Sequence, residues 1–162
     1  MILNLITAAN QGVLYHYTDL EGALGILQSG VINPTTNFQN AHKARGLKPG
    51  VSLSRHANLR LYGLTRLALD SDVIRHNHKL APFEFEPARH GRDGALHNAE
   101  EYVQGPLKKV HAALLGIDIV QGRDFKRNDG PGFVEKFRAL TDKPVIVHDP
   151  SITRAPPFRS KS

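Results

Sequence analysis

The feature that most constrains the fold is the passage from a short apolar strand into an amphipathic helix near the N-terminus. The alternating pattern of residues 13–17 predicts a strand. Beyond it, apolar residues recur at helical spacing: Leu20, Ala23, Leu24, Leu27 and Val31. We therefore predict a helix over residues 19–29, and Gly30 stands where a left-handed glycine commonly ends a helix.

Polar groups mark the junction between this strand and this helix. His16 and Thr18 fall on the same strand face, opposite Tyr15 and Tyr17. Thr18 and Glu21 have the spacing of a capping box, so Thr18 is the predicted N-cap. The sequence thus predicts an imidazole and a hydroxyl at a strand end, where a ligand can reach them.

The rest of the chain indicates short strands separated by turn-rich loops. Further strands are predicted at residues 51–55, 65–70, 83–86, 100–103, 116–120 and 144–148, with helices at 108–115 and 133–140 and a turn or short helix at 57–62. Loops are predicted at residues 33–50, 72–80 and 88–98. The result is an α+β fold of many short strands with two or three helices, in one domain over residues 1–148 with a loose tail over residues 149–162.

Composition excludes several classes of protein. The 162 residues are 40% hydrophobic and 22% charged, as in a globular domain. There is no cysteine, which rules out disulfides, thiolate nucleophiles and cysteine-ligated zinc. No apolar run approaches the ~20 residues that span a bilayer, so no membrane partner is expected. The net charge of +6 favours polyanionic partners or a phosphate-bearing cofactor, although a basic surface alone explains it as well.

The histidines raise the question of a metal site. His76 and His78 flank Asn77 in a charged segment, where strand geometry would put both rings on one face. No third ligand stands at a diagnostic spacing, so we expect no metal.

Three motifs occur in a suggestive order. The first is the Tyr15-His16-Tyr17-Thr18 strand end, the second is the Ser52-Leu53-Ser54-Arg55 strand, and the third is the Glu100-Glu101 pair that opens a strand. Taken alone, each has an ordinary structural explanation as a cap, a solvated strand face or an ion pair. Together they resemble the NAD site of ADP-ribosyltransferases, in the histidine-type branch that includes PARP, diphtheria toxin and DNA-modifying toxins. Similar compact proteins occur in phages and bacterial conflict systems.

The resemblance implies a split β-sheet core and a role for each matching residue. His16 would contact the adenosine ribose, the Tyr17 backbone would pair with the nicotinamide amide, and Thr18 completes that motif. Ser52 and Ser54 would brace the active site. Arg55 would bind the diphosphate of NAD, because a guanidinium group can donate two parallel hydrogen bonds to phosphate oxygens. Among the tyrosines that could stack on nicotinamide (Tyr17, Tyr62 and Tyr102), Tyr62 is favoured because it follows the middle motif.

A glutamate would supply the catalytic carboxylate. Glu100 and Glu101 point to opposite strand faces, so only one can serve. Glu101 directly precedes Tyr102-Val103 and is favoured, although the Glu-x-Glu form of the family is absent. The carboxylate would stabilise an oxocarbenium-like ribose as the bond to nicotinamide breaks. No metal is required.

The resemblance implies an enzyme that transfers ADP-ribose from NAD to a protein or nucleic-acid acceptor, with residues 33–50 and 88–98 facing that acceptor. Three alternatives remain open: an NAD glycohydrolase, an NAD-dependent RNA 2′-phosphotransferase, and a non-catalytic binding or phage structural protein. Glu101 argues against the phosphotransferase. The expected location is the cytoplasm of a bacterium or of a phage-infected host, with a virion-associated protein as the alternative.

Overall fold

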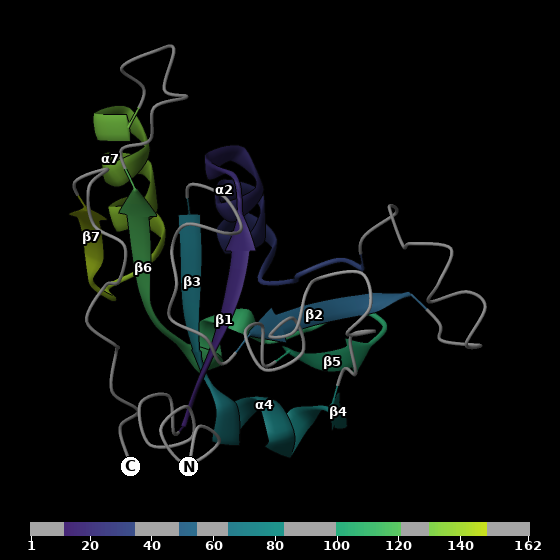
Figure 1. The fold of residues 1–162 in the computed structure, drawn as a ribbon. Coiled ribbons are helices and arrows are strands. Elements are labelled where there is room, and N and C mark those ends of the chain that lie inside the picture. Colours follow the sequence, from purple (N-terminus) through teal and green to yellow (C-terminus); the bar gives the residue numbers. More distant parts are fainter. Residues whose placement is uncertain (1–11, 35–48, 55–64, 83–99, 121–129, 149–162) are drawn as a thin grey trace, which may run out of the picture.

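The computed structural model describes residues 12–34, 49–54, 65–82, 100–120 and 130–148, which form one mixed sheet and its helices. The sheet has seven strands in the order β4-β5-β2-β1-β3-β6-β7 (Figure 1). In chain order the elements are β1 (Val13–Thr18), α2 (Leu20–Ser29), β2 (Gly50–Ser54), β3 (Thr65–Asp70), α4 (Ser71–Asn77), β4 (Leu80–Pro82), β5 (Glu100–Gln104), α6 (Val110–Ala113), β6 (Leu114–Val120), α7 (Gly130–Leu140) and β7 (Val145–His148).

The sheet is split into two halves. One half holds β4, β5 and β2, and the other holds β1, β3, β6 and β7. They are joined at a single paired position, Tyr15 opposite Ser54. Figure 1 shows β2 and β5 running across the direction of β1, β3 and β6. All neighbouring strands are antiparallel except β6 and β7. The predicted α+β split sheet is confirmed, with four helices in the described residues instead of two or three.

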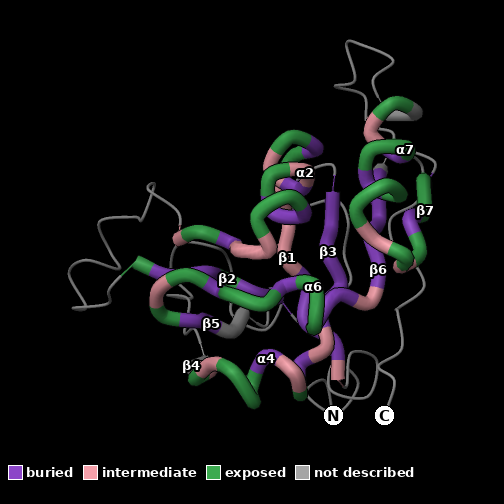
Figure 2. The backbone as a smooth tube through the Cα atoms, turned by 180° about the vertical axis from the view of Figure 1, so that it is seen from behind, coloured by how far each residue is buried: buried purple, intermediate pink, exposed green. Residues whose placement is uncertain are grey.

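The main core lies between the sheet and α2, α6 and α7, which cover the same face (Figure 2). Helix α2 buries Leu20, Ala23, Ile26 and Leu27, close to the predicted stripe, and α7 buries Phe137. The opposite face of the sheet carries a smaller apolar cluster around Val13, Tyr15 and Ala68. Successive residues of β1 therefore face two different environments, as the alternation of its side chains requires.

The cap of α2 differs from the prediction by one residue. Thr18 remains in β1, where it pairs with Thr65. Asp19 is the N-cap, and its carboxylate accepts a hydrogen bond from the Gly22 N–H at 2.6 Å. The reason is that strand pairing holds Thr18 while Asp19, which caps equally well, is extended. At the other end Gly30 is left-handed and donates to the Ile26 carbonyl, as predicted.

The predicted loop at residues 72–80 is wrong, because the chain forms α4 there. Asp70 caps this helix by accepting hydrogen bonds from the N–H groups of Asp72 and Val73, and Ile74 is buried beneath it. His76 consequently lies on a helix and not on a strand. Residues 57–62, 83–86 and the tail at 149–162, for which we made predictions, lie outside the described residues.

Candidate functional site

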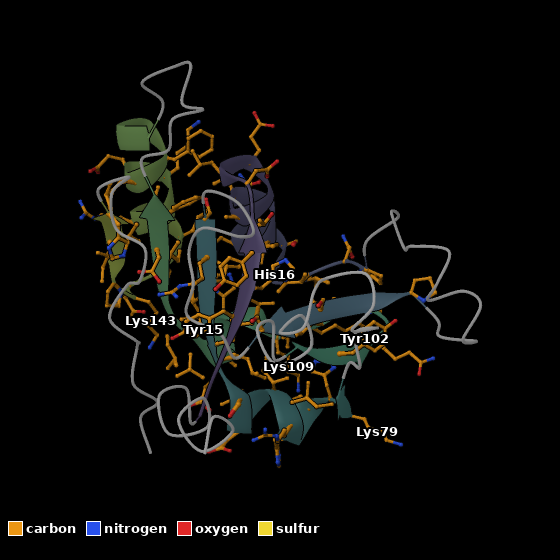
Figure 3. The ribbon with its side chains drawn as sticks, in the orientation of Figure 1. Tyr15, His16, Lys79, Tyr102, Lys109 and Lys143 are labelled. Atoms are coloured by element: carbon orange, nitrogen blue, oxygen red, sulfur yellow. The ribbon has the colours of Figure 1, made fainter. Side chains whose placement is uncertain are left out.

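His16 lies where the two half-sheets meet. Its Nδ1 is 3.3 Å from the carbonyl oxygen of Ser52 across the split (Figure 3). Because a carbonyl only accepts, this contact assigns the ring hydrogen to Nδ1 and leaves Nε2 as an acceptor. The hydrogen bond fixes the orientation of the ring, so a ligand hydroxyl would meet a nitrogen of defined position.

The environment of His16 keeps its imidazole neutral. Burial lowers the pKa of His16, because it penalises the charged ring, and the hydrogen bond to Ser52 offsets part of this effect. A neutral ring that donates at one nitrogen and accepts at the other suits the recognition of a hydroxyl group.

Strand register separates the two candidate glutamates. Across β2 and β5, Glu101 is paired with Leu53 and Glu100 with Ser54. Directly paired residues share a face, and the Tyr15–Ser54 pair carries this alternation into β1. Glu101 therefore shares its face of the sheet with His16, whereas Glu100 falls on the face of the two serines.

The serine motif has two different environments. Ser54 is buried where β2 meets both β1 and β5, and Ser52 is exposed. Ser52 contacts His16 through its carbonyl group, not through its hydroxyl. Thr18 lies at the end of β1, where its hydroxyl packs so closely on Gly22 that a Cβ there would collide with it. The register thus brings His16 and Glu101 to one face and the serines to the other.

A buried ionic network that the sequence reading did not single out lies on the opposite face. Asp118 of β6 accepts a hydrogen bond at 2.7 Å from Nε of Arg66, which belongs to β3, and its other oxygen lies 2.6 Å from Nε2 of His148. Arg66 and Asp118 are 0% exposed and His148 is 7% exposed. Removing one partner from such a group leaves a buried charge, which is strongly destabilising.

The network also contacts the face of β1 that carries Tyr15 and Tyr17. The Arg66 guanidinium lies 4.1 Å from the centre of the Tyr15 ring, a cation–π contact. Burial raises the pKa of Tyr17, and the charge of Arg66 and its hydrogen bond to Tyr17 oppose this rise. The two tyrosines flank His16 in the chain, so Arg66 fixes the strand on one face while His16 faces the split.

Two of the predicted site residues, Arg55 and Tyr62, lie outside the described residues. Tyr102 is buried on β5, where burial raises its pKa. Within the described ranges, no group of three or more histidine or acidic side chains could hold a metal ion. No helix in that part of the chain is long and apolar enough to cross a membrane.

Solved structures with the same fold exist, although neither a protein-family model nor a curated protein matches the sequence. DarT of Thermus sp. 2.9 in complex with carba-NAD+ superimposes with a TM-score of 0.50 at 10% identity, covering 85% of this chain and 95% of DarT. The chain has an ADP-ribosyltransferase-like fold. The complex of this DarT with NAD+ gives a TM-score of 0.50 at 12% identity, covering 85% of this chain and 95% of that one.

Proposed function

We propose that this protein is an ADP-ribosyltransferase that uses NAD as donor and a protein or nucleic acid as acceptor. The observation that carries the proposal is the register that puts the His16 and Glu101 positions on one face of the sheet, on opposite sides of the split and with β2 between them. Two further facts support it. The neutral His16 ring offers an acceptor to a ribose hydroxyl, and the DarT structures of this fold hold NAD+ and carba-NAD+.

The reaction follows from the chemistry of the N-glycosidic bond. The bond between ribose C1′ and the nicotinamide nitrogen breaks, and its electron pair leaves with the nitrogen, which neutralises the pyridinium. The ribose becomes oxocarbenium-like, and the Glu101 carboxylate stabilises the positive charge. The acceptor nucleophile then bonds to C1′ and loses its proton to solvent. Nicotinamide is a good leaving group, so no strong acid is needed.

The remaining residues of the three motifs bind the donor in this proposal. His16 holds the adenosine ribose, and the Tyr17 backbone pairs with the nicotinamide amide. Ser54 braces the strand junction from its buried position. Arg55 meets the diphosphate, and Tyr62 stacks on nicotinamide.

The test is nicotinamide release by the purified protein, with Glu101→Gln and Glu100→Gln compared as a matched pair. Both variants remove one charge from adjacent residues of the same strand, so a general charge effect would appear in both. We expect Glu101→Gln to lower release by at least about 100-fold, the size typical of losing a group that stabilises transition-state charge. Glu100→Gln keeps most of the activity.

A second measurement separates binding from catalysis. His16→Ala should weaken NAD binding, as measured by calorimetry, whereas Glu101→Gln should bind NAD and fail to cleave it. A labelled-NAD transfer assay then distinguishes a transferase from a glycohydrolase. A correctly folded Glu101→Gln variant with full NAD turnover would show that the catalytic assignment is wrong. A wild-type protein that neither binds nor cleaves NAD would refute the function itself.

A further inference from the structure

We propose that the outer edge of strand β7 pairs antiparallel with β7 of a second copy of this chain, so that two chains form a symmetric dimer with one continuous sheet. Strand β7 ends the seven-stranded sheet, and among the described residues it pairs only with β6. Figure 1 shows it at the margin of the sheet. The inference is independent of the proposed function, because it uses no residue of the candidate site.

Large apolar side chains are exposed at this edge. In the part of the chain that the structure describes, they are Leu140 at the end of α7, at 37% exposure, and Ile146 and Val147 of β7, at 41% and 42%. Alternation along the strand puts Ile146 and Val147 on opposite faces of the sheet. The edge is therefore apolar on both faces, which is unfavourable in water and favours further pairing.

The opposite edge of the sheet is protected in a way that β7 is not. Strand β4 has only three residues, includes Pro82 and follows Lys79. A short strand, a proline and a nearby lysine are features that block the addition of another strand. Strand β7 has the sequence VIVH, with three β-branched residues that favour strands and neither proline nor lysine.

The backbone of β7 defines how a second copy would pair. The Ile117 N–H donates to the Pro144 carbonyl at 2.9 Å, so the Pro144 carbonyl faces β6. Backbone groups of successive strand residues point to alternate sides, so Val145 and Val147 direct their N–H and C=O groups away from β6. In an antiparallel copy centred on Ile146, Val145 meets Val147 of the other copy, and each such pair exchanges two hydrogen bonds.

The charges beside β7 are compatible with a second copy. Helix α7 and the turn after it carry three cations and two acids, a net charge of +1 out of the +6 of the whole chain: Glu135, Lys136, Arg138, Asp142 and Lys143. The two-fold axis places both α7 helices on one face of the joined sheet, running antiparallel. Glu135 and Arg138 are 3.6 Å apart and mostly exposed, so this weak pair can exchange for contacts between the copies.

The match of β7 with itself favours a second copy over an unrelated strand. Around the two-fold axis valine meets valine and isoleucine meets isoleucine, so one strand supplies both sides of the contact. Pairing about a two-fold axis closes as a dimer. A strand of four residues and part of a helix bury little area, below about 1,200 Å² in total, so we expect a weak dimer with a micromolar dissociation constant.

The first test is sedimentation velocity of the full chain from about 1 to 100 µM, a range that brackets a micromolar dissociation constant. We expect a concentration-dependent equilibrium between monomer and dimer. Ile146→Lys places two ammonium groups directly opposite each other, so it should weaken the dimer at least about 10-fold. Gln104→Lys is the control, because it adds the same charge at an exposed position of β5 in the other half of the sheet.

Cysteine cross-linking tests the register. The chain contains no cysteine, so each substitution supplies the only thiol. Ile146→Cys places its two Cα atoms about 4.5 Å apart in a non-hydrogen-bonded pair, which is within disulfide range, so oxidation should give a covalent dimer. Val147→Cys should cross-link poorly, because an offset of two residues along the strands separates its Cα atoms by about 8 Å.

Several results would overturn the inference. A protein that is monomeric at every concentration would exclude a second copy as the occupant, and an assembly larger than a dimer would exclude the closed pairing. A dimer that both lysine variants weaken equally, or that neither weakens, would not be formed through β7. Stronger cross-linking of Val147→Cys than of Ile146→Cys would refute the register. Both cysteines replace exposed side chains, so this arm of the test does not require the lysine variant to fold.

Discussion

Replacing Asp118 by alanine is the most direct test of the ionic network behind β1. Asp118 is fully buried, and its two oxygens serve Arg66 and His148. Its removal takes away a carboxylate that is bonded to the Arg66 guanidinium, which is 0% exposed. Breaking a buried pair in this way costs about 3–5 kcal/mol. Since a domain of this size is stable by only about 5–15 kcal/mol, we expect the variant to lose about a fifth or more of its stability.

Urea denaturation measures the loss. With a slope of about 2 kcal/mol per molar urea, a loss of about 4 kcal/mol lowers the unfolding midpoint by about 2 M. Glu135→Gln is the control, because it breaks the Arg138–Glu135 pair on α7, whose side chains are 58% and 79% exposed. An exposed pair contributes at most about 1 kcal/mol.

The double variant Arg66→Met/Asp118→Leu tests the cause of that loss. It removes both charges together and should be less destabilised than Asp118→Ala, because the buried guanidinium is removed along with the carboxylate. A midpoint for Asp118→Ala that falls no further than that of Glu135→Gln would refute the reasoning.

Three other predictions follow from local geometry and burial. Gly25→Ala should stabilise the protein by up to about 1 kcal/mol in a thermal or urea melt, since a Cβ there meets nothing within 4 Å; Gly22→Ala, in the same helix, should destabilise it, because its Cβ would collide with the Thr18 hydroxyl. Burial raises the pKa of Tyr15 to about 12, with Arg66 opposing and Asp118 adding to the rise. Because the unfolded chain releases this proton near pH 10 and the folded chain does not, stability should fall between pH 10 and 12 in wild type, and less in Tyr15→Phe. Burial lowers the pKa of His16, so as the pH falls the unfolded state binds a proton before the folded state does. The contribution of the neutral His16 ring to stability is therefore present above about pH 6.5 and is lost as the pH falls. His16→Gln should flatten this part of the acid profile, and an NMR titration should show His16 still neutral after exposed histidines are charged.

Local patterns predicted most of the elements that surround the candidate site. The β3 strand matches its predicted bounds, and α2 begins and ends within a residue of its prediction, because both elements present long apolar patterns to one core. Helix α4 was missed because only Ser71 and Ile74 of its seven residues are buried, too few to show a helical period. Its signal was Asp70, a residue type that commonly caps helices.

The contacts between distant strands could not be read from local patterns. Alternation shows that Glu100 and Glu101 face opposite ways, but only the pairing of β5 with β2 shows which of them shares a face with His16. The ionic network had a visible signal. Asp118 stands between two isoleucines of β6, and Arg66 is the second residue of β3, next to Leu67; two buried residues of opposite charge require each other. The sequence contained both partners, and the register of β3 against β6 identified them as a pair.

The alternation of β1 relates this network to the candidate site. Tyr15 and Tyr17 face the Arg66 side, and His16 between them faces the split, so a shift of the strand by one residue would exchange the two sets. The Arg66–Tyr15 contact and the Arg66–Asp118 pair oppose such a shift, because it would bury His16 in place of a tyrosine against a guanidinium. The buried charges therefore do more than stabilise the fold. They specify the register that brings His16 to Ser52 and, through the Tyr15–Ser54 pair, onto the same face as Glu101.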